Sequence, residues 1–130
     1  MKTGEQASVE ARSLRGQTAY RSGLAAEDRV SAHYEERGHE LAGTRWRGSG
    51  GEIDLVMRKG GDIVFVEVKQ ARSLHEAAFR LSARQLKRVY DAASEFLAGE
   101  PRGLATPARV DLALVGGSGE IEIVENVMPA

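Results

Sequence analysis

The feature that most constrains the fold is a pair of apolar segments joined by the double glycine Gly60-Gly61. Gly-Gly favours a two-residue hairpin turn, so residues 51–56 and 63–68 are predicted to form antiparallel strands. In that register facing residues have numbers that sum to 121, which places Asp54 opposite Glu67. Because like charges opposite each other destabilise a sheet, the hairpin predicts a cation between these carboxylates, and a divalent metal is the usual candidate.

The two faces of this hairpin differ in character. Because side chains alternate along a strand, one face is predicted to carry the four charged residues Glu52, Asp54, Glu67 and Lys69, with Glu52 opposite Lys69. The other face is predicted to be entirely apolar, with Ile53, Leu55, Met57, Val64, Val66 and Val68. The second strand is apolar on both sides until its end, which is typical of a central strand covered by other elements. Ionised groups rarely stand at the end of such a strand without a partner or a function.

Composition excludes several classes of protein. The chain has 130 residues, 42% apolar and 28% charged, with no cysteine and a net charge of −1. It contains no apolar run long enough for a membrane span and no signal-peptide core, so a cytoplasmic location is the default expectation. The near-zero net charge argues against a protein that coats nucleic acid nonspecifically. Residues 1–17 are expected to form a flexible arm, and residues 18–130 a single domain.

Periodicity outside the hairpin predicts an α/β fold. Helical spacing favours a first helix that ends near Arg37, with Gly38 as its stop, and a second helix over residues 83–98. The remaining strands are predicted over about residues 39–47, 109–115 and 120–127. The order is then α-β-β-β-α-β-β, a mixed β-sheet flanked by helices.

The charged end of the hairpin has the composition of a metal site for phosphodiester hydrolysis. Hard cations such as Mg²⁺ or Mn²⁺ take oxygen ligands, which Asp54, Glu67 and the Val68 backbone carbonyl could supply. The metal would polarise a phosphodiester and lower the pKa of a bound water. Lys69 could orient that water or neutralise charge in the transition state. The alternative is an ordinary surface ion pair between Glu52 and Lys69.

Basic residues cluster near the same segment. Residues 69–88 contain six positive residues and one negative residue, an excess of five positive charges. Such a surface suits phosphates, although a solvated helix face is the commoner outcome. Trp46 could stack on a base between two arginines that hold phosphates, or it could belong to the core. The predicted nucleic-acid contacts are Arg45, Arg47, Arg72, Arg84, Lys87 and Arg88.

Two motifs, Gly-Glu-Ile-Asp-Leu-Val over residues 51–56 and Phe-Val-Glu-Val-Lys over residues 65–69, resemble the YraN-like family of uncharacterised bacterial proteins. The resemblance covers roughly residues 20–127. That family is similar in fold to the restriction-endonuclease-like, or PD-(D/E)XK, nucleases and to Holliday-junction resolvases. The resemblance implies that Asp54 and Glu67 are the metal-binding acids and that Lys69 is the catalytic lysine.

The resemblance also implies supporting residues. Glu52 corresponds to an additional acid of the first motif, and Glu27 resembles an acid of the first helix that completes the site in resolvase-like members. Gln85 either caps its helix with Ser82 or points toward the site, as a glutamine does in many related nucleases. The later Arg-Phe-Asp motif is here Arg109-Val110-Asp111, in which Asp111 is expected to brace the fold with a basic group such as Arg109. Two positions depart from the family, which usually has Asn where this chain has Arg45 and Lys where it has Gln85.

Three functions are compatible with these residues. The first is a metal-dependent endonuclease that acts on nucleic acid, DNA foremost, with branched or flapped DNA among the candidate substrates and a homodimer as one assembly for so small a chain. The second is a nucleic-acid-binding or partner-recruiting module that keeps the fold without efficient cleavage. The third is a structural domain whose charged face is an ion-pair network. The acids together with Lys69 favour the first over the third, but they do not separate the first from the second.

Overall fold

The computed structural model describes residues 24–78 and 81–129. Within them the chain forms one five-stranded sheet with the strand order β1-β2-β3-β4-β5. The strands are β1 (Glu40–Arg47), β2 (Glu52–Lys59), β3 (Asp62–Gln70), β4 (Ala108–Val115) and β5 (Ile121–Val124). A helix over residues 24–35 precedes β1, and α2 (Leu74–Ala78), α3 (Ala83–Ala98) and the 3₁₀ helix η1 (Gly103–Ala105) lie between β3 and β4. The predicted order is confirmed, with the short α2 and η1 added, whereas the predicted arm over residues 1–17 lies outside the described residues.

The hairpin forms in the predicted register. Every pair in the β2–β3 ladder joins residues whose numbers sum to 121: Leu55–Val66, Val56–Phe65, Met57–Val64, Arg58–Ile63 and Lys59–Asp62. Gly60 has a φ of +61°, a conformation that glycine adopts in hairpin turns without strain. The ladder stops one pair short of Asp54 and Glu67. The two strands therefore separate at the point where the two acids lie.

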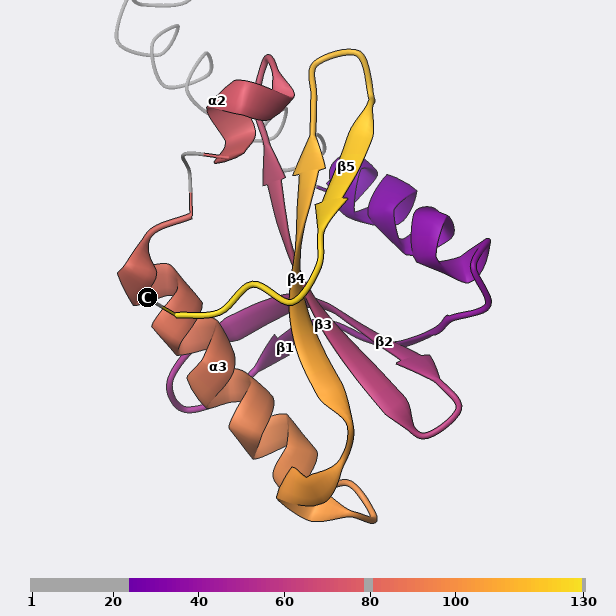
Figure 1. The fold of residues 1–130 in the computed structure, drawn as a ribbon, viewed down its shortest axis with the longest axis vertical. Coiled ribbons are helices and arrows are strands. Elements are labelled where there is room, and N and C mark those ends of the chain that lie inside the picture. Colours follow the sequence, from indigo (N-terminus) through magenta and orange to yellow (C-terminus); the bar gives the residue numbers. More distant parts are fainter. Residues whose placement is uncertain (1–23, 79–80, 130) are drawn as a thin grey trace, which may run out of the picture.

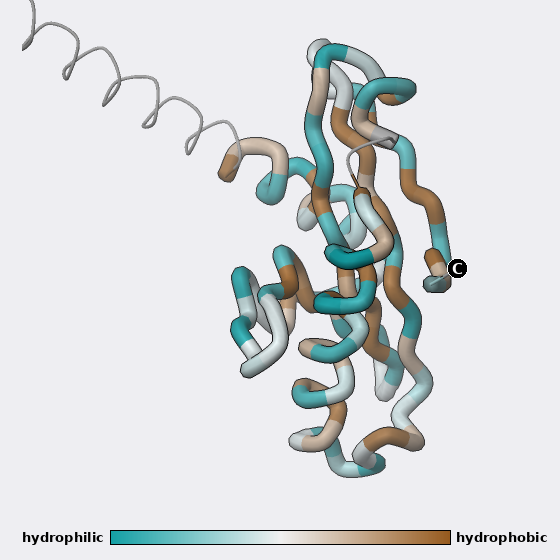
Figure 2. The backbone as a smooth tube through the Cα atoms, turned by 90° about the vertical axis from the view of Figure 1, so that its left-hand side faces the viewer, coloured by the Kyte–Doolittle hydropathy of each residue, from teal (hydrophilic) through white to brown (hydrophobic). Residues whose placement is uncertain are grey.

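Two helical layers cover the sheet (Figure 1). The helix over residues 24–35 packs Val30 and Tyr34 against an apolar cluster that includes Leu55 and Val66. On the other face α3 packs its apolar side against a cluster that includes Phe65. Figure 2 shows hydrophobic residues recurring along the strands between these layers. Among the described residues, no helix is long and apolar enough to cross a membrane.

The connection from β3 to β4 makes the sheet mixed. β3 pairs antiparallel with β2 and parallel with β4, so it is a central strand, as its apolar sequence predicts. The helix α3 has the predicted bounds, because Ser82 and Gln85 form a capping box at its start and Gly99 ends it. This crossover places the start of α3 beside the C-terminal end of β3.

Two predictions about the strands were wrong. Ile53 packs with Val56 in the cluster beneath α3 and not with Leu55 on the opposite face. The alternation breaks at Asp54, which has no partner in either ladder, and the residue opposite on β1, Arg45, has a φ of +47°. The last strand ends at Val124 and not near residue 127.

The early end of β5 follows from the contacts of the next residues. Asn126 has a φ of +54°, and its N–H donates to Asp111 Oδ1 at 3.0 Å. The Val127 N–H donates to the Val110 carbonyl at 2.7 Å. The positive φ of Asn126 therefore ends the regular ladder while residue 127 still lies beside β4, and Val127 packs against the apolar cluster beneath α3.

Candidate metal and nucleic-acid site

The separated ends of β2 and β3 bring two carboxyl groups together. Glu67 lies on the α3 face of β3 and is 9% exposed. Asp54 Oδ2 accepts a hydrogen bond of 2.8 Å from the Val68 N–H, where the interstrand ladder has already ended. The Asp54 and Glu67 carboxyl groups interact with each other, since Asp54 raises the pKa of Glu67.

The electrostatics of the pair favour the protonated form of Glu67. Burial raises the pKa of Glu67 to about 9, and the neighbouring Asp54 acts in the same direction. Lys69 acts against this shift, with its Nζ 3.9 Å from Glu67 Oε1. The raised pKa favours a protonated Glu67 beside Asp54 at neutral pH, and a cation between the two groups would relieve the same repulsion.

A cavity opens beside Glu67. It has a volume of about 180 Å³ and is lined by Gly51, Glu52, Glu67, Lys69, Gln85, Arg88 and Val89. A second hollow shares Lys69 and Gln85 with it and continues along Val68 and Gln70. The structure thus brings together two predicted site residues from the hairpin, one predicted supporting acid and one predicted glutamine.

Glu52 differs in one respect from the prediction. The β2–β3 ladder does not extend to Glu52 and Lys69, so these residues are not a cross-strand pair. Glu52 instead pairs across β1 with Arg47, whose Nε lies 3.2 Å from Glu52 Oε2. The cause is the same separation of β2 from β3 that leaves Asp54 and Glu67 outside the ladder.

A third acid approaches from the opposite layer. Glu27, in the helix over residues 24–35, lies with its Oε2 3.4 Å from Arg45 Nε. Burial raises the pKa of Glu27, and the Asp54 charge adds to that shift, while Arg45 opposes it. Glu27 is therefore close enough to Asp54 to interact with it, but its carboxylate is engaged by a guanidinium.

The donor set fits a hard divalent cation that takes few protein ligands. Among residues 24–78 and 81–129, no group of three or more His, Asp or Glu side chains is arranged to hold a metal ion. Asp54 and Glu67 offer two carboxyl groups that interact with each other. Mg²⁺ usually keeps several waters and binds through one or two carboxylates plus substrate phosphate, which matches this pair.

The glycine-rich loop before β2 positions the cavity wall. The Ser49 N–H donates to Glu95 Oε2 at 2.7 Å, and the Ser49 hydroxyl donates to the other oxygen of the same carboxylate. A Cβ at Gly51 would lie 2.9 Å from the Arg88 carbonyl oxygen, so glycine allows the loop to approach α3 closely. The sequence patterns did not identify Glu95; the signal was an acid on α3 two turns after Arg88, on a helix that follows a glycine-rich loop.

The predicted nucleic-acid contacts divide into two groups. Arg84, Lys87 and Arg88 are exposed on α3, and Arg88 also lines the cavity. Lys87 is in an ion pair of 3.0 Å with Asp91. Arg72 is exposed before α2.

The arginines of β1 are engaged by acids, and Trp46 between them belongs to the core. Arg45 contacts Glu27 and Arg47 contacts Glu52. The Trp46 ring packs edge-on against Phe96 at 5.4 Å, within the cluster beneath α3. The core interpretation of Trp46 is therefore confirmed.

Gln85 satisfies both of its predicted roles. Its Oε1 accepts from the Ser82 N–H at 3.3 Å, and its own N–H donates to Ser82 Oγ at 3.1 Å, which completes the capping box. The same side chain lines the cavity beside Glu67. One residue therefore caps the start of the helix and lines the cavity of the candidate site.

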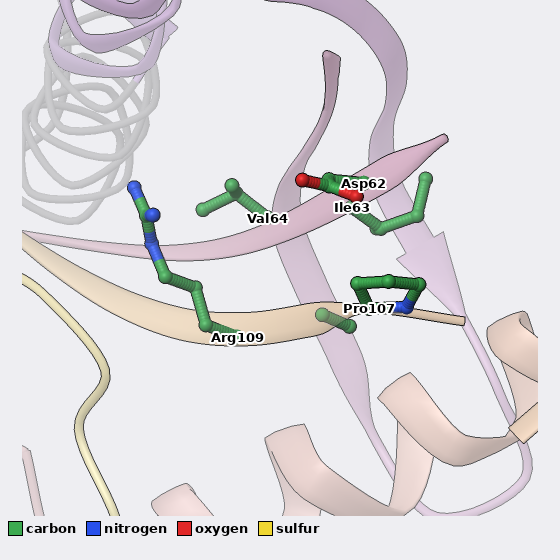
Figure 3. Close-up of a pocket in the computed structure, with 6 residues that line it drawn as sticks. Asp62, Ile63, Val64, Pro107 and Arg109 are labelled. Carbon is green, nitrogen blue, oxygen red and sulfur yellow. The ribbon is translucent and has the colours of Figure 1, made fainter. Parts of the chain in front are cut away.

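A different pocket lies at the other end of β3 (Figure 3). It is lined by Asp62, Ile63, Val64, Pro107, Ala108 and Arg109. Arg109 extends from β4 beside Val64 and donates to Asp111 Oδ1 at 3.0 Å. Asp111 thus braces the fold with Arg109 as predicted, and this pocket lacks the paired acids of the candidate site.

Comparison with known proteins gives a consistent family. The family model described as "Uncharacterised protein family UPF0102" matches residues 26–115. A UPF0102 protein of Ruegeria pomeroyi is 53% identical over 118 residues, 91% of this chain and 96% of the relative. UPF0102 proteins of Cereibacter sphaeroides and Roseobacter denitrificans are 50% and 48% identical, covering 90% and 87% of this chain and 100% and 88% of the relatives. The matched region contains both hairpin motifs, and the chain belongs to the uncharacterised protein family UPF0102, the YraN-like family.

Proposed function

We propose that this protein is a nuclease that depends on a divalent metal, Mg²⁺ or Mn²⁺, and hydrolyses phosphodiester bonds in nucleic acid, DNA foremost. The observation that carries the proposal is the pair of interacting acids, Asp54 and Glu67, at the separated ends of β2 and β3. A buried acid beside a second acid is costly unless a cation or a proton lies between them. Lys69 stands beside the pair, as phosphodiester chemistry requires.

The residues of the candidate site would have different roles in phosphodiester hydrolysis. A bound divalent ion would supply Lewis acidity and a water of lowered pKa. Asp54 and Glu67 would hold that ion, with the Val68 carbonyl as a further candidate oxygen. The Lys69 ammonium would orient the attacking water or neutralise charge that develops on the phosphate.

The surroundings support a nucleic-acid substrate. The exposed basic residues of α3, Arg84, Lys87 and Arg88, begin at the mouth of the cavity. Such a surface can hold phosphates on either side of the scissile bond. Branched and flapped DNA are the substrates to test first, and a homodimer would enlarge the contact surface of so small a domain.

The proposal is tested by calorimetric titration of Mg²⁺ and Mn²⁺ into wild type, Asp54→Asn and Glu67→Gln. We expect binding in the wild type and a loss of at least about tenfold in affinity in each variant. Glu122→Gln, an exposed acid on β5, is the matched control and should bind as the wild type does. The absence of divalent-ion binding at millimolar concentration, with and without oligonucleotide, would refute the nuclease mechanism.

Cleavage is tested on branched, flapped, single-stranded and RNA substrates. We expect Lys69→Met to retain metal binding while its cleavage rate falls by about a hundredfold or more. The engagement of Glu27 by Arg45 favours one other function, a nucleic-acid-binding module with little activity. That module is the better description if metal and oligonucleotide both bind and every substrate survives intact.

A further inference from the structure

Arg45 occupies an unusual position beside the candidate site. It is a strand residue with a φ of +47°, in the left-handed region that L side chains other than Asn and Asp rarely adopt. It lies opposite Asp54, at the gap that the β1–β2 pairing leaves between Thr44–Leu55 and Trp46–Ile53. Strained backbone of this kind persists where the surrounding structure holds it, and it is concentrated at functional sites.

The Arg45 side chain reaches across to the helix over residues 24–35. Its Nε lies 3.4 Å from Glu27 Oε2, and the Arg45 and Glu27 side chains are 35% and 13% exposed. The contact joins a strand to a helix that covers the opposite face from α3. It places a permanent positive charge beside Glu27, the acid that approaches Asp54 from that side.

We propose that Arg45 is the built-in counter-ion of Glu27 and that it withholds this third carboxylate from the divalent metal. The inference rests on the proposed function, because it assumes that Asp54 and Glu67 hold such a metal. A guanidinium is always charged and matches carboxylate geometry, so it competes with a cation for the same oxygens. Metal affinity rises with the number of charged ligands, so Arg45 sets a weaker, two-carboxylate site.

The repulsion around Glu27 supports this assignment. Asp54 and Glu52 both raise the pKa of Glu27, and Arg45 lowers it. Without the guanidinium, Glu27 would face two negative groups with no cation nearby in the described part of the chain. A metal bound at Asp54 and Glu67 would then be the nearest source of compensating charge, and Glu27 would turn toward it.

The test is a calorimetric titration of Mn²⁺ alone into Arg45→Asn. Asn removes the charge and tolerates the positive φ better than other side chains do. We expect Arg45→Asn to bind Mn²⁺ roughly tenfold more tightly than the wild type. The gain should disappear in Arg45→Asn/Glu27→Gln, which lacks the carboxylate, and in Arg45→Asn/Glu27→Asp, which keeps the charge but shortens the reach.

The structure offers a closely matched control. Arg58 pairs with Glu100 at 2.6 Å, and these side chains are also 35% and 13% exposed. Arg58→Asn removes the same charge from a pair of equal burial near the hairpin turn, so its Mn²⁺ affinity should equal that of the wild type. Each variant is first shown to unfold cooperatively in urea, so that metal affinity is compared between folded proteins.

The outcomes separate this inference from the proposed function. If the wild type binds Mn²⁺ through Glu67 and Arg45→Asn binds no more tightly, the counter-ion role is overturned and the metal site stands. An equal gain in Arg45→Asn/Glu27→Asp would also overturn it, because it would show a long-range charge effect without ligation. If no variant binds Mn²⁺, the proposed function fails and the inference fails with it.

Discussion

Two buried carboxylates on neighbouring strands have opposite surroundings. Asp111 on β4 is 0% exposed and accepts hydrogen bonds from Arg109 Nε, the Tyr34 hydroxyl and the Asn126 N–H. Glu67 on β3 is 9% exposed and contacts another acid, Asp54. The first group is satisfied by donors and stabilises the fold as a charge. The second is not, and burial raises its pKa to about 9.

The comparison separates a structural acid from a candidate ligand. Burial alone does not identify a functional carboxylate, because Asp111 is the more deeply buried of the two. What distinguishes Glu67 is a neighbour of the same charge, since such a pair needs a cation or a proton to be stable. The same substitution, acid to amide, should therefore have opposite effects at the two positions.

The largest effect is expected at Asp111. Asp111→Asn replaces an acceptor of several hydrogen bonds with an amide whose NH₂ group would face donors, and it leaves Arg109 without its buried partner. We expect a loss of about 3 kcal/mol in the free energy of unfolding, measured by urea denaturation. Glu122→Gln on the exposed side of β5 should change it by less than about 0.5 kcal/mol. A loss below about 1 kcal/mol at Asp111 would contradict the contrast.

The next effect concerns the wall around Glu67. In Gly51→Ala the new Cβ would lie 2.9 Å from the Arg88 carbonyl, which is backbone and cannot move aside. We expect a loss of about 2 kcal/mol by urea denaturation, because β2 must shift away from α3. Gly61→Ala is the matched control: its Cβ meets nothing within 4 Å, so its stability should stay within about 1 kcal/mol of the wild type. Equal losses of stability in Gly51→Ala and Gly61→Ala would show that the close approach of Gly51 to Arg88 does not stabilise the cavity wall.

Much of this arrangement follows from local rules that can be applied to the sequence. The hairpin register depends on a two-residue turn at Gly60-Gly61, and the bounds of α3 depend on a cap at Ser82 and a stop at Gly99. Each of these signals acts within a few residues of the chain, so the sequence predicts it well. The prediction of Asp54 beside Glu67 depends on that register alone.

What the sequence did not predict depends on contacts between distant segments. The end of the β2–β3 ladder and the rotation of Ile53 coincide with the positive φ of Arg45, on a different strand. The engagement of Glu27 follows from how its helix crosses the face of the sheet opposite α3. Neither signal lies within one element, so patterns of alternation and spacing cannot reveal it.

At Glu67 the amide substitution should stabilise the folded protein. The folded-state pKa of Glu67, about 9, lies above its ordinary value of 4.5, so its contribution is fully present below pH 4.5 and is lost as pH rises through 9. Glu67→Gln keeps a donor for Asp54 and removes the titration. In metal-free buffer we expect the wild type to lose at least ~1.4 kcal/mol more than the variant between pH 5 and pH 9. Parallel stability curves for the two proteins would show that Glu67 is not protonated in the fold.

The smallest effect separates the two roles of Gln85. Gln85→Ala removes the side chain that caps Ser82, so we expect a loss of about 0.5–1 kcal/mol in the free energy of unfolding. Gln85→Glu restores the capping box, because Glu accepts the same N–H, but it adds a carboxylate to the Glu67 cavity. Stability should then return to within about 0.5 kcal/mol of the wild type, while Mn²⁺ affinity rises several-fold. An unchanged Mn²⁺ affinity would mean that Gln85 acts only as a helix cap. It would also mean that a carboxylate added to the cavity does not favour cation binding, so the cavity would be no better a cation site than the surroundings of Asp111.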